Sequence, residues 1–251
     1  MSALQKSRYE LKYVITESQA DAIRRLVKTH LASDEHSHGN AIGYRVRSLY
    51  LDSRSLTCYN ETQSGTKNRF KLRIRFYDGV DSPAFLEIKR RVTNVVIKQR
   101  ATVSRTDAEL LLRGASPSPA MLINDNANQR QALRDFCQLR DRLGAVGNVF
   151  VEYYRQAYES PGGNQHRVTF DRNVCGSDYE IGNGLKMPPR SRLTKIEGVI
   201  LEMKYIDRPA SWMIDLSRRF GLKSRSVPKY VECVDVLQPT TWPNVGAMTS
   251  G

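Results

Sequence analysis

Residues 69–77 alternate strictly between charged and apolar side chains. The cations are Arg69, Lys71, Arg73 and Arg75, and the apolar residues between them are Phe70, Leu72, Ile74 and Phe76. Residues two apart share one face of a β-strand, so this segment is predicted to bury one face and carry a row of cations on the other. Neighbours in that row lie roughly 6.5–7 Å apart and repel one another unless water or an anion balances them. A charged outer face is common on half-buried strands, so one strand alone does not identify an anion site.

Composition indicates a globular chain with an anionic partner. The 251 residues suffice for one large domain or two small ones. Lys and Arg number 39 against 26 Asp and Glu, which gives a net charge of +13. Such an excess suits nucleic acid, a phosphorylated small molecule, polyphosphate or an acidic membrane surface, and charge alone does not choose among them.

Cysteine usage and hydropathy favour a cytoplasmic location. The four cysteines are Cys58, Cys137, Cys175 and Cys233; none lies in a CxxC pair, and they are expected to be reduced thiols. The first residues lack the apolar core of a signal peptide, and no apolar run approaches the ~18 residues of a membrane span. If the protein serves a membrane process, it is therefore expected to do so from the membrane surface or through a partner protein.

The remaining segments predict a mainly antiparallel α+β chain. Further strands are expected at 8–15, 44–51, 83–92, 95–103, 148–158, 165–172 and 199–206. Helices are expected from a Thr16 cap, with Gln19 at its third position, to about residue 31, and at 107–113, 129–143 and 211–220. Residues 229–236 are a short helix or strand. Residues 34–40, with His36 and His38, are expected to be a solvated loop, and 114–128 an insertion or mobile segment.

Charged pairs recur on the polar faces of these strands. Glu10-x-Lys12, Glu87-x-Lys89 and Glu202-x-Lys204 set a carboxylate beside an ammonium, whereas Arg45-x-Arg47, Arg73-x-Arg75 and Lys98-x-Arg100 set two cations side by side. In an antiparallel barrel one face of every strand points inward. If the apolar faces pack outward against the helices, the charged faces line a tunnel.

A tunnel of this kind is costly when empty, because its cations repel and are partly desolvated. A polyanion reverses both effects through charge-assisted hydrogen bonds. The carboxylates can hold Mg²⁺ or Mn²⁺ bridging to phosphate oxygens, which completes the set needed for phosphoryl transfer. Nucleic acid is disfavoured, because the aromatic residues alternate to the face opposite the cations and a stacking platform needs both together.

The ordered set of segments resembles the VTC domain, the polyphosphate polymerase domain of the vacuolar transporter chaperone, within the triphosphate tunnel metalloenzymes. The segments are Arg-Tyr-Glu-Leu-Lys-Tyr (8–13), Ser-Leu-Tyr-Leu-Asp-Ser (48–53), Lys-Leu-Arg-Ile-Arg-Phe-Tyr (71–77), Phe-Leu-Glu-Ile-Lys (85–89), Val-Glu-Tyr-Tyr-Arg-Gln-Ala-Tyr (151–158), Arg-Val-Thr-Phe-Asp (167–171), Leu-Glu-Met-Lys-Tyr (201–205) and Pro-Lys-Tyr (228–230). The resemblance implies one domain over 6–236, flexible tails at 1–5 and 237–251, and an eight-stranded tunnel barrel with a charged interior and short flanking helices.

The resemblance also implies an activity and a set of site residues. Such domains move the γ-phosphate of ATP onto a growing polyphosphate chain with a divalent metal. The implied catalytic residues are Arg73, Arg75, Lys89 and Lys204; the further phosphate ligands are Lys12, Lys98, Tyr153, Arg155, Arg167 and Lys229; and the metal ligand is Glu202, with Glu10 and Glu87 as weaker candidates. The implied partners are ATP, polyphosphate and Mn²⁺ or Mg²⁺. The resemblance also allows a membrane-associated protein partner, and no nucleic acid is expected.

The chain departs from the family pattern in two places. Pro228 stands where a Ser is usual, and Thr62 falls near the position of an upstream arginine for which Lys67 or Arg69 could substitute. Arg8 stands where the related CYTH triphosphatases carry the first Glu of their opening motif. Two alternatives to a polymerase therefore stay open: a tripolyphosphate or nucleoside triphosphate hydrolase on the same scaffold, and a non-catalytic module that binds polyphosphate or inositol phosphates.

Overall fold

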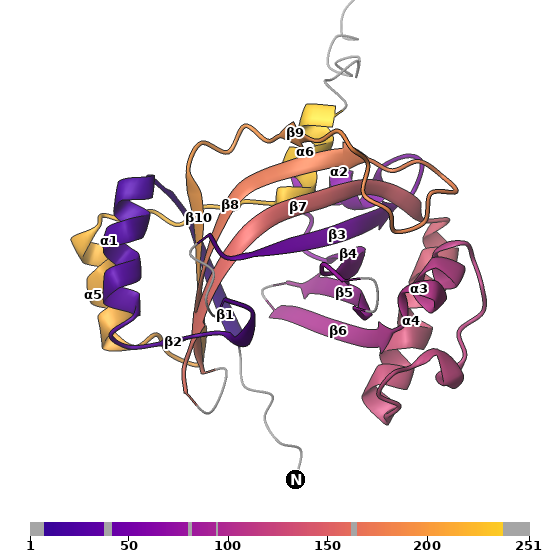
Figure 1. The fold of residues 1–251 in the computed structure, drawn as a ribbon, viewed down its shortest axis with the longest axis horizontal. Helices are drawn as coiled ribbons and strands as arrows, with labels where there is room; N and C mark the ends of the chain where they lie inside the picture. Colours follow the sequence, from indigo (N-terminus) through magenta and orange to yellow (C-terminus); the bar gives the residue numbers. More distant parts are fainter. Residues whose placement is uncertain (1–7, 38–41, 80–81, 94, 162–164, 238–251) are drawn as a thin grey trace, which may run out of the picture.

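One curled antiparallel sheet organises the chain (Figure 1). The computed structural model describes residues 8–37, 42–79, 82–93, 95–161 and 165–237. Its main path runs, in spatial order, through β1 (Arg8–Ile15), β10 (Val199–Ile206), β8 (His166–Asp178), β7 (Val146–Glu159), β3 (Tyr44–Asp52), β4 (Arg69–Phe76), β5 (Ala84–Val92) and β6 (Val95–Val103). Short strands β2 (Ala32–Ser33) and β9 (Arg192–Leu193) pair with β7 and β8. The predicted eight strands and their antiparallel class are confirmed.

The sheet curls into a half-barrel. Within the described residues, its two end strands, β1 and β6, are not paired with each other. The curl nevertheless sets β1 opposite β5, since the ammonium of Lys89 lies 3.5 Å from the carboxylate of Glu10. We call the concave side of this sheet the inner face.

Apolar side chains cover the convex side and pack against two pairs of helices. One cluster joins Leu72, Ile74 and Leu86 to α3 (Arg105–Leu112) and α4 (Ala127–Leu143). A second joins Tyr13 and Leu201 to α1 (Glu17–Val27) and α5 (Ser211–Arg219). Figure 1 shows one pair at each end of the curled sheet, α1 and α5 at the left and α3 and α4 at the right. Each fully buried aliphatic side chain stabilises this packing by about 1.5–3 kcal/mol, which forces the alternating charged residues inward.

The helix starts follow their local signals. The predicted capping box of α1 is present, with Thr16 and Gln19 each accepting a backbone N–H of the other, but the helix ends at Val27, earlier than expected. After β3 the chain forms α2 (Thr57–Gln63), where the buried Asp52 carboxylate accepts the backbone N–H groups of Cys58 and Tyr59. Two short 3₁₀ turns, η1 (Glu35–Ser37) and η2 (Pro119–Met121), complete the elements before the last helix.

Residues 229–237 form a helix, α6 (Lys229–Leu237), that packs on the inner face of β7 and β8. Tyr230 stacks on Tyr50 of β3 and donates a hydrogen bond to Asp52 at 2.7 Å. Leu237 still belongs to this helix, so the expected tail begins no earlier than 238; the tails at 1–5 and 238–251 lie outside the described residues. None of the helices in the described ranges is long and apolar enough to cross a bilayer.

Candidate functional site

The sheet brings the predicted site residues together on its inner face. They come from eight elements: Glu10 and Lys12 on β1, Arg73 and Arg75 on β4, Glu87 and Lys89 on β5, Lys98 on β6, Tyr153 and Arg155 on β7, Arg167 on β8, Glu202 and Lys204 on β10, and Lys229 on α6. Side chains two apart on a strand share a face, and the antiparallel register sets the charged rows of adjacent strands side by side.

Glu87 is the centre of one charged group. Its side chain is almost completely buried, and its carboxylate lies 2.6 Å from Arg73, 2.6 Å from Lys98 and 2.5 Å from Arg100. Burial acts to raise the pKa of Glu87, but the surrounding cations, led by Arg73, outweigh it and hold the pKa well below its ordinary value. Glu87 is therefore ionised and organises the three cations around it.

Glu202 is the centre of a second group on the facing wall. Its buried carboxylate lies 3.3 Å from Lys12, 3.1 Å from both Lys204 and Lys229, and 3.6 Å from Arg155. Burial opposes ionisation, yet these four cations keep the pKa of Glu202 well below its usual range. A carboxylate that stays charged inside a cationic cluster can act as a metal ligand.

Asp171 on β8 is a site residue that the sequence analysis missed. It is fully buried; it accepts two 2.7 Å hydrogen bonds from Arg155, and it lies 2.7 Å from the ammonium of Lys229. Asp171 is the last residue of the row Arg167-x-Thr169-x-Asp171. The alternation of this strand could have shown that its side chain shares a face with Arg167. Asp171 fixes the positions of two predicted phosphate ligands.

Cations outnumber carboxylates in this central group. Ten Lys and Arg side chains meet four acids: Lys12, Lys71, Arg73, Arg75, Lys89, Lys98, Arg100, Arg155, Lys204 and Lys229 against Glu10, Glu87, Asp171 and Glu202. Glu10 joins the two walls, 3.1 Å from Lys12 and 3.5 Å from Lys89. The remaining positive charge creates a strong potential for an anion.

Arg75 and Lys71 are part of that unbalanced charge. Buried Arg75 contacts the hydroxyl of Tyr153 at 3.3 Å, and among the residues that the structure describes no carboxylate lies within 4.0 Å of it. Burial, with Lys12 and Lys89 nearby, lowers the pKa of Lys71 to about 7. Burial acts to raise the pKa of Tyr153, but Arg155 and Arg75 lower it below its ordinary value. An anion bound here would relieve repulsion that the protein does not itself balance.

The acids fit a metal that arrives with phosphate. Mg²⁺ commonly binds one or two carboxylates and takes its other oxygen ligands from phosphate and water. No cluster of three His, Cys, Asp or Glu side chains that could hold a metal alone occurs in the described part of the chain. Glu202 can supply the single carboxylate, with Glu10 beside the same lysines, and its role as metal ligand stays a prediction.

Two groups of predicted cations do not belong to this central group. Arg45 and Arg47 were assigned to a charged inner row, which is wrong: they lie on the outer side of β3, where both pair with Glu152. On β3 both faces carry apolar residues, so alternation alone did not orient the strand. Arg167 lies at the edge of the inner face, paired with Asp34 at 2.8 Å and Glu159 at 2.6 Å.

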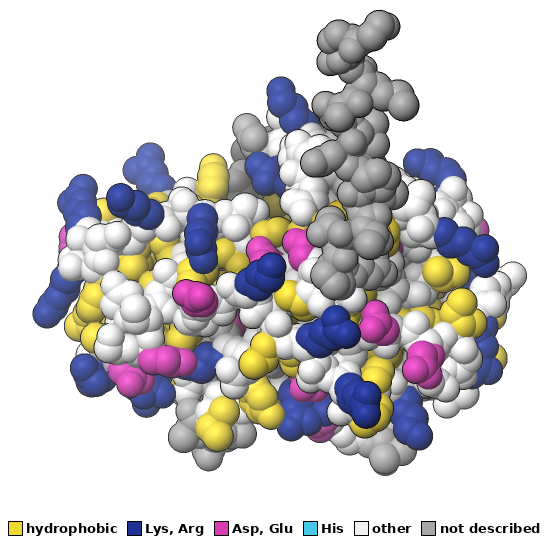
Figure 2. Space-filling view, turned by 90° about the horizontal axis from the view of Figure 1, so that it is seen from above, with side chains coloured by type: hydrophobic (Ala, Val, Ile, Leu, Met, Phe, Trp, Pro, Cys, Tyr) yellow, Lys and Arg dark blue, Asp and Glu magenta, His cyan; other side chains and the backbone are white. Residues whose placement is uncertain are grey.

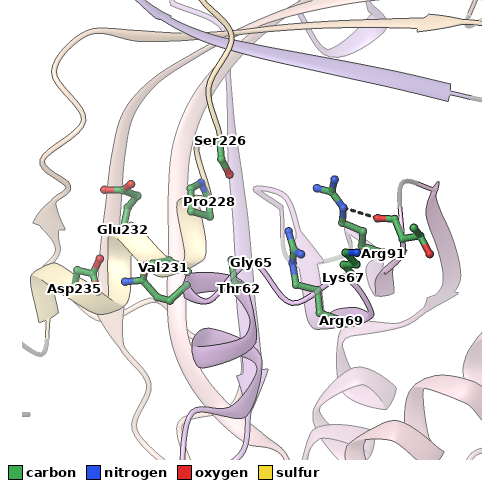
Figure 3. Close-up of a pocket in the computed structure, with 12 residues that line it drawn as sticks. Thr62, Gly65, Lys67, Arg69, Arg91, Ser226, Pro228, Val231, Glu232 and Asp235 are labelled. Atoms are coloured by element: carbon green, nitrogen blue, oxygen red, sulfur yellow. Dashed lines mark hydrogen bonds between the residues drawn. The ribbon is translucent and has the colours of Figure 1, made fainter. Parts of the chain in front are cut away.

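A groove of about 630 Å³ opens at one end of the charged rows (Figure 3). Lys67, Arg69 and Arg91 form one wall, and Glu232 and Asp235 of α6 form the other. Arg69 and Arg91 continue the inner rows of β4 and β5 by one step. Thr62 and Pro228, the two positions at which the sequence departs from the VTC pattern, line this same groove, so Lys67 and Arg69 stand where substitute charges were expected.

The outer surface differs from this interior. On the face drawn in Figure 2, Lys and Arg side chains are scattered among Asp, Glu, polar and apolar ones and do not form one broad basic patch. Several aromatic rings, by contrast, share the inner face with the cations: Tyr50 and Tyr153 contact Arg73 and Arg155, and Phe85 contacts Arg100. The prediction that aromatics and cations occupy opposite faces is therefore wrong for these residues.

Comparisons with known proteins identify a family for the chain but no curated relative. Among curated proteins none matches the chain. Solved structures that match the chain include a "putative adenylate cyclase" from Vibrio parahaemolyticus, at 12% identity and a TM-score of 0.46 over 91% of this chain and 98% of that one. Another is a "putative adenylyl cyclase" from Hippeastrum described as having a dominant triphosphatase activity, at 14% identity and a TM-score of 0.47 over 93% and 97%. The family model of the VTC domain matches residues 7–238, and the chain therefore belongs to the VTC domain family.

Proposed function

We propose that the chain is a metal-dependent polyphosphate polymerase that transfers the γ-phosphate of ATP onto a polyphosphate chain held along the inner face. Membership of the VTC domain family supports an enzyme that acts on polyphosphate or triphosphate. The observation that carries the proposal is the excess of ten cations over four carboxylates, which continues beyond the central group through Arg69 and Arg91 into the groove. A short triphosphate would not need so long a cationic path, whereas a growing chain would.

The proposed reaction needs no covalent nucleophile from the protein. A terminal oxygen of the polyphosphate chain attacks the γ-phosphorus, the bond to the β-bridging oxygen breaks, and ADP leaves. Arg73 and Arg75 would neutralise charge on the transferring phosphate, while Lys89 and Lys204 would hold its neighbours from the two facing walls. Glu202 would hold Mn²⁺ or Mg²⁺, which supplies charge neutralisation between phosphate groups when bound.

The fixed cations position both reactants. Arg73 is held by Glu87, Arg155 by Asp171, and Lys229 by Asp171 and Glu202, so their geometry exists before phosphate binds. Preorganised charge costs no rearrangement during the reaction and converts a bimolecular transfer into one between neighbours on the same surface. The proposed location is cytoplasmic, with any membrane reached through a partner protein.

Incubation of the purified chain with ATP and Mn²⁺ tests this proposal, with products resolved by length on a gel. Growth of long phosphate chains is expected, and an Arg75→Met variant is expected to lose at least about tenfold in rate, because a charged hydrogen bond to phosphate is lost. Arg45→Met on the outer side of the sheet is the matched control. Release of phosphate without chain growth would select a hydrolase, and binding without turnover would select a binding module.

A further inference from the structure

An aromatic cluster lies at the end of the inner face away from the groove. The His36 ring stacks on Tyr77 with centroids 5.4 Å apart and an interplanar angle of 21°, and it also meets Tyr44 at 5.2 Å. Tyr77 meets Phe85 edge-on at 5.9 Å. His36 is exposed, and Tyr44, Tyr77 and Phe85 are partly buried, so the cluster borders solvent.

The rings of Tyr77, Phe85 and Tyr44 each lie beside a predicted phosphate ligand. Tyr77 follows Arg75 by two residues, which places it roughly 6.5–7 Å further along the same face. Phe85 is the cross-strand partner of Arg75, and Tyr44 is the cross-strand partner of Arg155. The aromatic rings therefore lie directly next to the buried cations Arg75 and Arg155 along the inner face.

A buried carboxylate holds His36 in place. Asp34 accepts hydrogen bonds from the backbone N–H of Ser37 at 3.0 Å, from the Tyr44 hydroxyl at 3.2 Å and from Arg167 at 2.8 Å. Its side chain is almost fully buried, although the sequence analysis expected a solvated loop here. The hydroxyl of Ser37 also accepts the backbone N–H of Ala157, so η1 is fixed at both ends and presents His36 outward.

The two ends of the inner face thus differ in chemistry. None of the described residues that line the groove at the cationic end is aromatic. The other end offers stacked rings beside Arg155 and Arg75, and aromatic faces bind nucleobases of any sequence while cations bind the attached phosphates.

We propose that His36, Tyr44, Tyr77 and Phe85 form a stacking site for the base of a nucleoside triphosphate whose phosphates lie against Arg75 and Arg155. The inference rests on the proposed function, and it deepens it by naming the residues that hold the base of the nucleotide donor. It also sets the direction in which the nucleotide and the polyphosphate chain lie along the inner face. The base lies at the aromatic end, the γ-phosphate points toward Arg73 and Lys71, and the growing chain leaves past Arg69 and Arg91.

Calorimetric titration of two ligands tests the stacking site without turnover: the β,γ-imido analogue of ATP and inorganic tripolyphosphate. Tyr77→Leu and His36→Ala are expected to weaken binding of the nucleotide analogue about tenfold or more, the range that loss of one base–ring stack produces, and to leave tripolyphosphate affinity within about twofold. Tyr77→Phe keeps the ring and should retain wild-type affinity.

The chain offers a matched control outside the site. Tyr9 and Tyr205 stack on the outer side of β1 and β10 with centroids 5.4 Å apart and an angle of 20°, nearly the geometry of His36 and Tyr77. Tyr9→Leu should change neither affinity. Equal losses for both ligands, or no loss for either, would overturn the stacking site while leaving the phosphate site standing. A wild-type chain that binds neither ligand would instead overturn the proposed function and this inference together.

Discussion

The ammonium of Lys229 lies 2.7 Å from the carboxylate of Asp171, joining the first turn of α6 to the inner face of β8. Both side chains are buried, Asp171 completely. Burial opposes both charges, but Asp171 and Glu202 raise the pKa of Lys229 above its ordinary value, and Arg155 and Lys229 lower that of Asp171. The last helix is therefore held to the sheet by a charged contact as well as by apolar packing.

Removing the charge of Asp171 should destabilise the fold. In Asp171→Asn, Arg155 and Lys229 lose their closest buried partner, and breaking a buried ion pair costs about 3–5 kcal/mol of unfolding free energy. Denaturant titration measures the loss. Asp21→Asn removes an exposed carboxylate that pairs with Arg24 and should leave the transition in place. If the two variants unfold alike, the charged contact does not hold α6.

Phosphate affinity should fall as pH rises through the pKa of Lys71. That pKa is about 7 in the free protein, so the ammonium loses its proton between about pH 6 and 8. Burial also lowers the pKa of Lys98 to about 7 and that of Lys89 to about 8, so both lysines add to the fall. A bound anion raises these pKa values, hence binding takes up protons, and each lysine can lower the affinity by up to about tenfold per pH unit above its pKa.

A variant that cannot lose this charge isolates the effect from the ionisation of phosphate itself. Lys71→Arg stays protonated, so its affinity for tripolyphosphate should exceed that of the wild type by a margin that widens above pH 7. Titrations in two buffers of different ionisation enthalpy count the protons taken up. Parallel pH curves for the two proteins would show that Lys71 does not titrate on binding.

Neutralising Glu202 should move affinity and turnover in opposite directions. Four cations surround this carboxylate, so Glu202→Gln leaves the inner face more positive and should bind tripolyphosphate more tightly when metal is absent. Turnover should fall about a hundredfold or more, because the proposed metal ligand is lost. Glu152→Gln, which changes the outer side of the sheet, is the control. A drop in metal-free affinity would contradict this, because it would show that the positioning of the cations by Glu202 outweighs the negative charge it adds.

Much of the fold could be read from alternation. On β4 the charged and apolar residues separate cleanly, so the sequence predicted both the strand and which face is charged. It could not orient β3, where Val46 and Leu49 are both buried on opposite faces. There only the packing of Leu49 under α4 decides that Arg45 points outward.

The charge network depends on contacts between distant segments. Glu87 was a weak candidate for metal, yet its partners Arg73 and Lys98 come from the two adjacent strands and make it a centre for cations. Asp171 and Asp34 were missed because each is a single acid whose partners arrive from other elements. Periodicity assigns a residue to a face, whereas cross-strand register decides what it touches.

A crystal structure with a non-hydrolysable triphosphate and Mn²⁺ tests the central claim most directly, with the metal located by its anomalous signal. The phosphates should lie on the inner face within hydrogen-bonding distance of Arg73 and Arg75, with Mn²⁺ between a phosphate oxygen and Glu202. Phosphate bound only to outer cations such as Arg45 and Arg47, or no phosphate bound at saturating ligand, would contradict it.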